Sequence, residues 1–256
     1  MPVMDKALVR QRFRKAGAQY TQQAQVQQQM AKQLWQYAEQ FVPAPQRVLE
    51  IGCGQGGFTQ YLRGWSPLQK IVLNDLYLPR EALQALFPDE VEVQYVEGDI
   101  ETLALPSGID AVVSAASMQW LVDVPRLLQR LHASLNAGGH VVLSTFGPKQ
   151  YHEIRQLTGQ GLQYYSAQAW QHLLSVEFDV LLVQQEQQCL WFDSPWDVLK
   201  HLQQTGVTGA GQWQWNKTRL RTFMAQYVQQ YGRGEGDDAV SLTYHPIYLI
   251  ARKKHG

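Results

Sequence analysis

The 256-residue sequence lacks a charge imbalance and has few cysteines. Its 22 lysines and arginines match 22 aspartates and glutamates, so the net charge is zero and gives no electrostatic signature of nucleic-acid or anionic-membrane binding. Cys53 and Cys189 are too few for a disulfide framework. The seven histidines show no metal-ligand spacing, so we expect no bound metal.

Long hydrophobic runs are also missing. No apolar run approaches the length of a membrane span, and residues 1–10 lack the continuous apolar stretch of a secretory signal. We therefore expect a cytoplasmic protein, a monomer, that binds neither membrane nor nucleic acid. Hydrophobic residues still make up 45% of the chain and charged residues 17%, which is typical of a globular protein and excludes a disordered one.

Short apolar segments alternate with amphipathic ones through the middle of the chain. Such alternation is typical of a parallel β-sheet covered by helices on both faces. The predicted strands are residues 46–52, 70–75, 92–99, 109–117 and 140–146. Three helices are predicted between these strands: one that starts over residues 57–62, one through 81–87 and one at 123–135.

The two ends of the chain depart from this alternation. We expect residues 1–45 to form an N-terminal helical cover, and residues 46–256 to form the main domain with a lid-like helical insertion at about 194–235. The other predicted elements are a long helix over 5–41 broken near Gly17, a helix at 166–174 capped by Ser166, a strand at 179–192 and a closing strand at 241–254.

The stretch VLEIGCGQGG, residues 48–57, places a glycine-rich turn directly after the first strand. Gly52, Gly54 and Gly57 satisfy the G-x-G-x-x-G fingerprint of dinucleotide-binding proteins. Gly52, Gly54 and Gly56 equally satisfy the G-x-G-x-G loop that holds S-adenosylmethionine. The turn brings the backbone close to a ligand at the carboxyl end of the sheet, but the glycines alone do not choose between the two cofactors.

Three acidic residues at the ends of successive strands help to distinguish between these two cofactors. The Glu50 carboxylate would repel a pyrophosphate, whereas it would attract the ammonium and sulfonium of S-adenosylmethionine. Asp75 can accept both ribose hydroxyls in either cofactor. Asp99 can accept the adenine amine, while Ile100 packs on the ring or donates its backbone N–H. A single acid of this kind is often only a helix cap, but the ordered set predicts a methyltransferase.

VLEIGCGQGG, LNDL, EGDI, IDAVVSAASMQW and LNAGG together resemble the class I S-adenosylmethionine-dependent methyltransferases in order and content. The resemblance covers residues 46–146. It implies an α/β, Rossmann-like fold with a seven-stranded, mostly parallel sheet, an antiparallel last strand, N-terminal helices and a helical lid insertion.

Further segments, including the two ends of the chain, make the resemblance more specific within this class. RFRKAGAQYTQQA (12–24), SAASMQWLVD (114–123), STFGP (144–148), TGV (205–207) and LTYHPIYLIARK (242–253) are similar to the malonyl-[acyl-carrier protein] O-methyltransferase family of biotin synthesis. The departures are Thr21 for Asp, Arg14–Lys15 for Ser–Arg, and Asn74–Asp75–Leu76 for D-x-S. The resemblance implies a carboxyl O-methyltransferase that uses S-adenosyl-L-methionine to methylate the free carboxylate of malonyl-acyl carrier protein. Open alternatives are a methyltransferase for a quinol or another small metabolite, a binding module without catalysis, and a dehydrogenase.

The same resemblance suggests residue roles. Tyr20 would close over the methionine end of the cofactor, and Gln119 and Trp120 would face the acceptor, although Tyr20 and Trp120 can also be read as packing residues. Cys53 would be a small residue within the cofactor loop. The predicted cofactor site is Gln11, Tyr20, Glu50, Gly52, Cys53, Gly54, Gly56, Asn74, Asp75, Leu76, Asp99, Ile100 and Ala115. The predicted substrate site is Tyr20, Gln119, Trp120 and Arg126.

A malonyl carboxylate is already ionised at pH 7, so methyl transfer to it requires alignment and exclusion of water but no general base. We accordingly assign no catalytic residue. A cation is expected to orient the carboxylate, and acyl carrier proteins are acidic, so a basic rim is also expected. The candidates for orienting it are Arg12, Arg14, Lys15, Arg126 and Lys149. The candidates for the rim are Arg10, Arg12, Arg14 and Lys15, and the clusters Lys217–Arg219–Arg221 and Arg252–Lys253–Lys254.

Overall fold

The computed structural model describes residues 6–7, 9–11, 14, 24–88, 90–205, 216–234 and 237–254. They belong to two compact units, and each unit is described by itself. The large unit comprises Gln25–Thr145, Tyr165–Gln185 and Ile247–Gly256. The small unit comprises Met1–Ala24, Phe146–Tyr164 and Glu186–Pro246.

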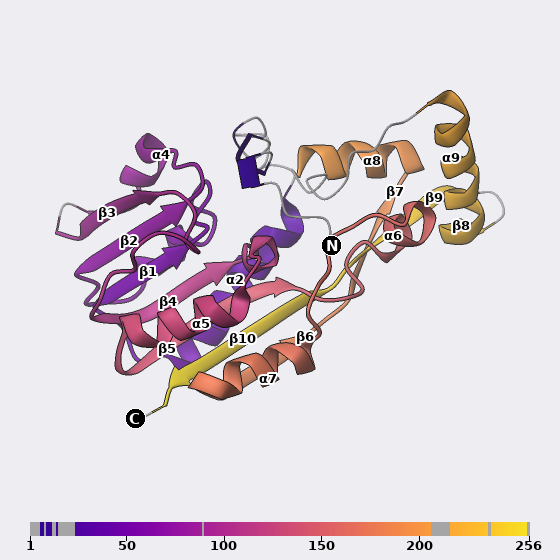
Figure 1. Ribbon diagram of the computed structural model, residues 1–256. Coiled ribbons are helices and arrows are strands. Elements are labelled where there is room, and N and C mark those ends of the chain that lie inside the picture. Colours follow the sequence, from indigo (N-terminus) through magenta and orange to yellow (C-terminus); the bar gives the residue numbers. More distant parts are fainter. Residues whose placement is uncertain are drawn as a thin grey trace. The chain divides into compact units, whose positions relative to one another are not determined.

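The large unit is built on a seven-stranded sheet (Figure 1). Its strands are β1 (Arg47–Ile51), β2 (Lys70–Asp75), β3 (Glu92–Glu97), β4 (Ile109–Ala115), β5 (Leu135–Phe146), β6 (Phe178–Gln185) and β10 (Pro246–Lys253). They lie in the order β3-β2-β1-β4-β5-β10-β6. β1 pairs in parallel with β2 and β4, and β3 and β5 continue the parallel pairing outward. β10 is antiparallel to β6. The predicted mostly parallel sheet with an antiparallel last strand is therefore confirmed.

Helices cover both faces of this sheet (Figure 1). They are α2 (Gln25–Phe41), α3 (Thr59–Leu62), α4 (Arg80–Gln84), the 3-10 turn η1 (Met118–Trp120), α5 (Val124–Ser134) and α7 (Ala167–Glu177). Leu128 of α5 and Trp170 of α7 pack into one core cluster with Leu249 of β10. Tyr37 of α2 contacts Tyr248, whose side chain points away from that of Leu249 because side chains alternate along a strand. α2 therefore covers the opposite face.

The small unit contains a three-stranded antiparallel sheet in the order β7-β9-β8. Its strands are β7 (Gln188–Phe192), β8 (Gly232–Gly234) and β9 (Asp237–Tyr244), and its helices are α6 (His152–Thr158), α8 (Pro195–Gln204) and α9 (Lys217–Tyr231). Tyr227 of α9 donates its hydroxyl to the Ser241 carbonyl at 2.8 Å, and His201 of α8 hydrogen-bonds the Tyr244 hydroxyl at 2.6 Å. These bonds attach both helices to β9.

Two predicted strands were wrong in their extent. The segment 179–192 divides into β6 and β7, and the segment 241–254 divides into β9 and β10, with the halves in different sheets. The second break falls at His245–Pro246, since proline has no N–H to donate to a ladder. Opposite this break, the Glu186 N–H donates to the Pro246 carbonyl at 3.1 Å. The two segments of the chain therefore pass from one sheet to the other at the same place. The sequence analysis also missed β8 and the three-stranded sheet.

Most of the other predicted strands and helices lie close to their predicted positions among the described residues, but β5 begins at Leu135, before the predicted residue 140. Of the helix predicted over 5–41, the structure gives α2, and residues 15–23 lie outside the described part. Ser166 caps α7 as expected, accepting the Ala169 N–H at 3.1 Å. α8 and α9 supply the helices predicted for the insertion at 194–235. The division into residues 1–45 and 46–256 stays a prediction, and Gly17 lies outside the described residues.

Candidate functional site

The glycine-rich turn after β1 contains three residues with left-handed backbone conformation. Gly52, Gly54 and Gly56 have φ of 71°, 51° and 84°. A Cβ on Gly52 would lie 2.4 Å from Ser117 Cβ, whereas a Cβ on Gly54 would have nothing within 4 Å. Gly57 has no left-handed φ and also has open space around it. The special conformations thus follow the G-x-G-x-G pattern and not the dinucleotide fingerprint.

Asn74 joins the loops that follow the first and third strands. Its buried side chain donates to the carbonyls of Val96 at 2.8 Å and Gly98 at 3.1 Å. Its own carbonyl accepts the N–H groups of Gly52 at 2.8 Å and Cys53 at 3.0 Å. The Asn74 amide therefore holds the loops after β1 and β3 together, and its predicted cofactor contact stays a prediction.

The Asp75 carboxylate is held by two backbone donors. Its Oδ2 accepts the Gly54 N–H at 2.9 Å, and its Oδ1 accepts the Tyr77 N–H at 3.1 Å. Burial raises the pKa of Asp75, and the N–H donors oppose that rise. Each oxygen keeps lone-pair capacity, so the carboxylate can accept ribose hydroxyls while it fixes the glycine turn. Leu76, next to it, is half-buried.

Replacing Asp75 with asparagine is expected to weaken cofactor binding about 10- to 100-fold, because a charge-assisted acceptor contributes roughly 1.5–3 kcal/mol. Asparagine keeps the size of the side chain but offers a neutral oxygen and an NH₂ group. Isothermal calorimetry with S-adenosyl-L-methionine measures the effect, and circular dichroism checks that the variant is folded. An unchanged affinity would mean that Asp75 only braces the turn.

Glu50 is a buried carboxylate without a hydrogen-bond partner. It is 1% exposed, and neither of its carboxylate oxygens is hydrogen-bonded to a described residue. Burial raises the pKa of Glu50 from 4.5 to about 8, and the negative charge of Asp75 adds to this rise. The nearby Thr59 hydroxyl acts against the rise, although it lies outside hydrogen-bonding geometry. An isolated carboxylate is expensive to ionise in such a place unless a cation approaches it. Glu50 therefore fits a positively charged ligand at the glycine turn.

The loop after β3 is fixed by an arginine that the sequence analysis did not select. Arg130 of α5 donates to the carbonyls of Ile100 at 2.9 Å and Glu101 at 2.8 Å, and also to that of Leu103. Asp99 accepts the Glu101 N–H at 3.0 Å. The Ile100 side chain is part of the core cluster, which favours its backbone N–H as the group offered to adenine.

Replacing Arg130 with methionine is expected to weaken cofactor binding about tenfold and to destabilise the fold by roughly 2 kcal/mol, because three carbonyls lose a charged donor. Lysine at this position should recover only part of both effects, since one ammonium group does not match the guanidinium fork. Calorimetry and urea unfolding measure the two quantities. If methionine changed stability alone, the loop would have no part in binding.

The chain after β4 turns sharply beside the glycine loop. Ala116, which follows the predicted cofactor residue Ala115, has a φ of 52°, and Ser117 Oγ donates to the Ile51 carbonyl at 3.1 Å. Gln119 donates its amide to the Ala116 carbonyl at 2.6 Å and accepts the Thr145 hydroxyl at 3.2 Å. These bonds join the ends of β1, β4 and β5.

Comparison with known proteins identifies the family. The family model described as "Methyltransferase domain" matches residues 21–180. The chain is 42% identical to the malonyl-[acyl-carrier protein] O-methyltransferase of Acinetobacter baylyi, over 98% of both chains. It is 38% identical to the protein of that name from Bacteroides fragilis, over 97% of this chain and 51% of the relative, about half of its length. The chain belongs to the malonyl-[acyl-carrier protein] O-methyltransferase family.

A solved structure supports the fold of this family. The N-methyltransferase NodS from Bradyrhizobium japonicum, in complex with S-adenosyl-L-homocysteine, is similar over 88% of this chain and 86% of that one, with a TM-score of 0.52 and 14% identity. At this identity the likeness concerns the fold alone. It agrees with the sheet order above, and the predicted class I methyltransferase fold is confirmed.

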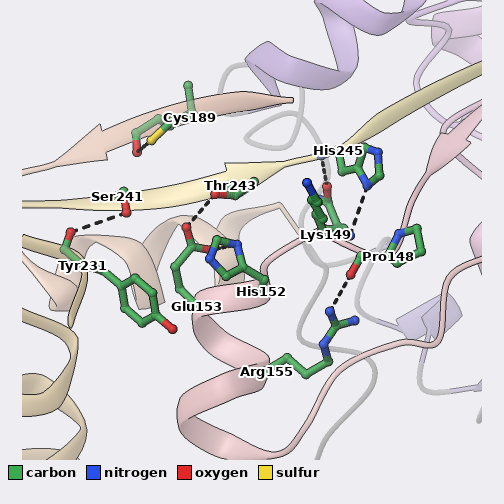
Figure 2. Close-up of polar contacts among 12 residues, drawn as sticks. Pro148, Lys149, His152, Glu153, Arg155, Cys189, Tyr231, Ser241, Thr243 and His245 are labelled. Carbon is green, nitrogen blue, oxygen red and sulfur yellow. Dashed lines mark hydrogen bonds and ion pairs between the residues drawn. The ribbon is translucent and has the colours of Figure 1, made fainter. Parts of the chain in front are cut away.

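Several family segments meet in the small unit, where the loop after β5 is bonded to the break between β9 and β10 (Figure 2). The His245 carbonyl accepts the Gly147 N–H at 2.8 Å, and its Nδ1 accepts the Lys149 N–H at 3.1 Å. Burial, and then the Lys149 charge, lower the pKa of His245, which keeps Nδ1 free to accept. The buried Glu153 accepts the Thr243 hydroxyl at 2.7 Å. The end of the STFGP segment, residues 146–148, and the YHP segment of the family resemblance are thus neighbours in this unit.

The predicted substrate residues of the family remain predictions. Trp120 is 8% exposed, so most of its ring is packed inside the fold. Arg126 is exposed on the first turn of α5, and Lys149 is exposed as well. Gln11 is helical and exposed. Tyr20, Phe13, Thr21, Arg12, Lys15 and residues 206–207 of TGV lie outside the described residues.

The residues that the structure describes also bear on metal and membrane binding. No group of three or more histidine, cysteine, aspartate or glutamate side chains suits a metal ion there. Among the same residues, no helix is both long and apolar enough to cross a membrane.

Proposed function

We propose that this chain transfers a methyl group from S-adenosyl-L-methionine to the free carboxylate of malonyl-acyl carrier protein and so forms the methyl ester that begins biotin synthesis. The buried, unpartnered carboxylate of Glu50 beside the glycine turn is the observation that carries the cofactor assignment. The acceptor follows the name of relatives that match this chain over nearly its whole length, such as that of Acinetobacter baylyi.

The residues around the turn would hold the cofactor in complementary ways. When bound, S-adenosyl-L-methionine would supply an electrophilic methyl group on a sulfonium. Glu50 would attract and balance the positive charge of the cofactor. Asp75 would accept hydrogen bonds from the ribose hydroxyls, and Asp99 would accept one from the adenine amine. The open space at Gly54 leaves room for the ligand to approach the backbone.

The acceptor requires orientation more than activation. A malonate carboxylate is ionised at neutral pH and is its own nucleophile, so no side chain has to remove a proton. The chain would contribute by alignment and by excluding water. We propose that Gln119 and Trp120, beside the end of β4, and a cation such as Arg126 take part in this alignment.

Mass spectrometry of malonyl-loaded carrier protein, after incubation with the enzyme and S-adenosyl-L-methionine, tests the function. We expect the malonyl carrier to gain one methyl group, and the carrier that bears only its free thiol to gain none. Methylation of a quinol with no change in the malonyl carrier would support the small-molecule alternative instead. Absence of cofactor binding in calorimetry would show that the chain is a binding module without catalysis.

A further inference from the structure

The first turns of α9 carry an unusual concentration of positive charge. Between Asp197 and Glu235 the chain has five lysines and arginines and no aspartate or glutamate, although the whole protein is neutral. Three of the five, Lys217, Arg219 and Arg221, stand at the start of α9 and are exposed. The charge is therefore local and faces solvent.

This placement opposes the electrostatics of the helix itself. The N-terminus of a helix is the positive end of its dipole, so cations there are unfavourable and acids would be favourable. Lys217 and Arg221 are also four residues apart, a spacing at which like charges repel. The Asn216 side chain caps the helix through the Arg219 N–H at 2.8 Å but adds no negative charge. Among the residues that the structure describes, none of the three cations forms an ion pair. Cations that destabilise the helix start, and that no ion pair with a described residue offsets, indicate a binding partner outside the chain.

The C-terminal basic cluster is, by contrast, used inside the fold. Lys253 donates to the Leu135 carbonyl at 2.7 Å, and Lys254 donates to the Ser175 carbonyl at 2.6 Å. Arg252 is paired with Asp179 at 3.4 Å. In the N-terminal cluster, Arg10 and Arg14 each interact with other residues, whereas Arg12 and Lys15 lie outside the described part. The cluster on α9 is therefore the better candidate for an external partner.

The helix also presents apolar groups next to these cations. Lys217, Arg221, Met224 and Val228 recur at helical spacing on one face, and Val228 is 39% exposed. The buried residues Phe223 and Tyr227 lie on another face, toward β9. A face with cations at one end, and the half-buried Met224 and the exposed Val228 at the other, suits an acidic protein surface with an apolar patch.

We propose that this face of α9 is the docking surface for the acidic carrier protein. The proposal rests on the function proposed above, in which the carrier delivers the malonyl group. Complementary charge at the rim of an interface acts mainly on encounter and on its salt dependence. The carrier would thus be captured by α9 independently of the chemistry at the acceptor.

A charge-reversal pair tests this surface. Lys217→Glu with Arg221→Glu, the two cations of this face, is expected to raise both the Kd and the KM for malonyl-acyl carrier protein about tenfold in 50 mM salt, and about twofold in 500 mM salt, with kcat little changed. The KM for malonyl-pantetheine, which lacks the protein, should stay unchanged. The two glutamates favour the helix dipole, so the thermal midpoint should not fall.

Lys32→Glu with Arg63→Glu is the matched control, because it reverses the same number of exposed charges elsewhere, on α2 and after α3. Its Kd for the carrier should remain close to that of the unmodified protein. An equal loss of carrier affinity in both pairs would overturn the proposal, as would an unchanged Kd in the α9 pair. Failure of the proposed function can be told apart from failure of the docking proposal. If the proposed function is wrong, the unmodified enzyme will methylate neither malonyl-acyl carrier protein nor malonyl-pantetheine, whatever its Kd for the carrier.

Discussion

Cofactor binding is expected to tighten about 50-fold between about pH 6 and about pH 8 and to release a proton. The reason is Glu50. Without ligand its carboxyl is buried and unpartnered, with a pKa raised to about 8, so below that pH it is mostly protonated. A cationic ligand stabilises the ionised form and lowers the pKa. The bound state then holds fewer protons, so affinity rises with pH and levels off above the pKa of the free protein.

Isothermal calorimetry in buffers of different ionisation enthalpy measures both the affinity and the proton released. Glu50→Gln is the matched control, because it keeps the shape of the side chain and cannot ionise. It should bind weakly at every pH and lose most of the proton release. If the unmodified protein and the glutamine variant showed the same pH profile, ionisation of Glu50 would play no part in binding.

The same ionisation should act on the stability of the ligand-free protein. The pKa of Glu50 is raised above its ordinary value of 4.5, so the folded state holds its proton more tightly than the unfolded state. The associated stability is fully present below about pH 4.5 and is lost as pH rises toward 8 and beyond, by about 2 kcal/mol between pH 6 and pH 8. Added cofactor should cancel this loss, and the glutamine variant should lack it.

The sequence predicts the parts of this fold that depend on local pattern. The strands of the parallel sheet are apolar runs between turns, and the charge of Glu50 is visible without any coordinate. The division of the two long strand segments was missed because apolar and aromatic residues resume beyond the polar run QQEQQ at 184–188 and lie on both sides of His245. A change of sheet is decided by which strands pair across the chain.

The sequence also could not predict the roles of residues that bond to partners far away along the chain. Asn74 donates to carbonyls 22 and 24 positions away, Arg130 to carbonyls up to 30 away, and Thr243 to Glu153, 90 positions away. In the sequence each is an ordinary polar residue, because the carbonyl or carboxylate it meets is defined only by packing. The charge pattern of α9 was visible in the sequence as one of three basic clusters. That its three cations form no ion pair with any described residue was not visible there.

Replacing Gly52 with alanine is expected to abolish detectable cofactor binding and to destabilise the fold by about 2–4 kcal/mol. Two causes combine at this position. The φ of 71° is strained for any residue with a side chain, and the new methyl group would lie 2.4 Å from both Cβ and Oγ of Ser117. Ser117 has little freedom to move, because its Oγ is bonded to the Ile51 carbonyl and to the Ser114 hydroxyl. Urea unfolding and cofactor titration measure the two losses.

Two further alanine variants separate strain, collision and ligand contact. Gly54→Ala keeps a strained φ of 51° but meets no atom within 4 Å, so it should cost about 1–2 kcal/mol of stability. Its methyl group would enter the open space that we propose for the cofactor, and cofactor binding should weaken. Gly57→Ala has neither the strain nor a collision and should leave both stability and binding near their original values. A large effect at Gly57 would revive the dinucleotide fingerprint, since that pattern requires a glycine there. Ser117→Gly combined with Gly52→Ala should restore part of the lost stability, because removing the Ser117 side chain relieves the collision and leaves only the backbone strain.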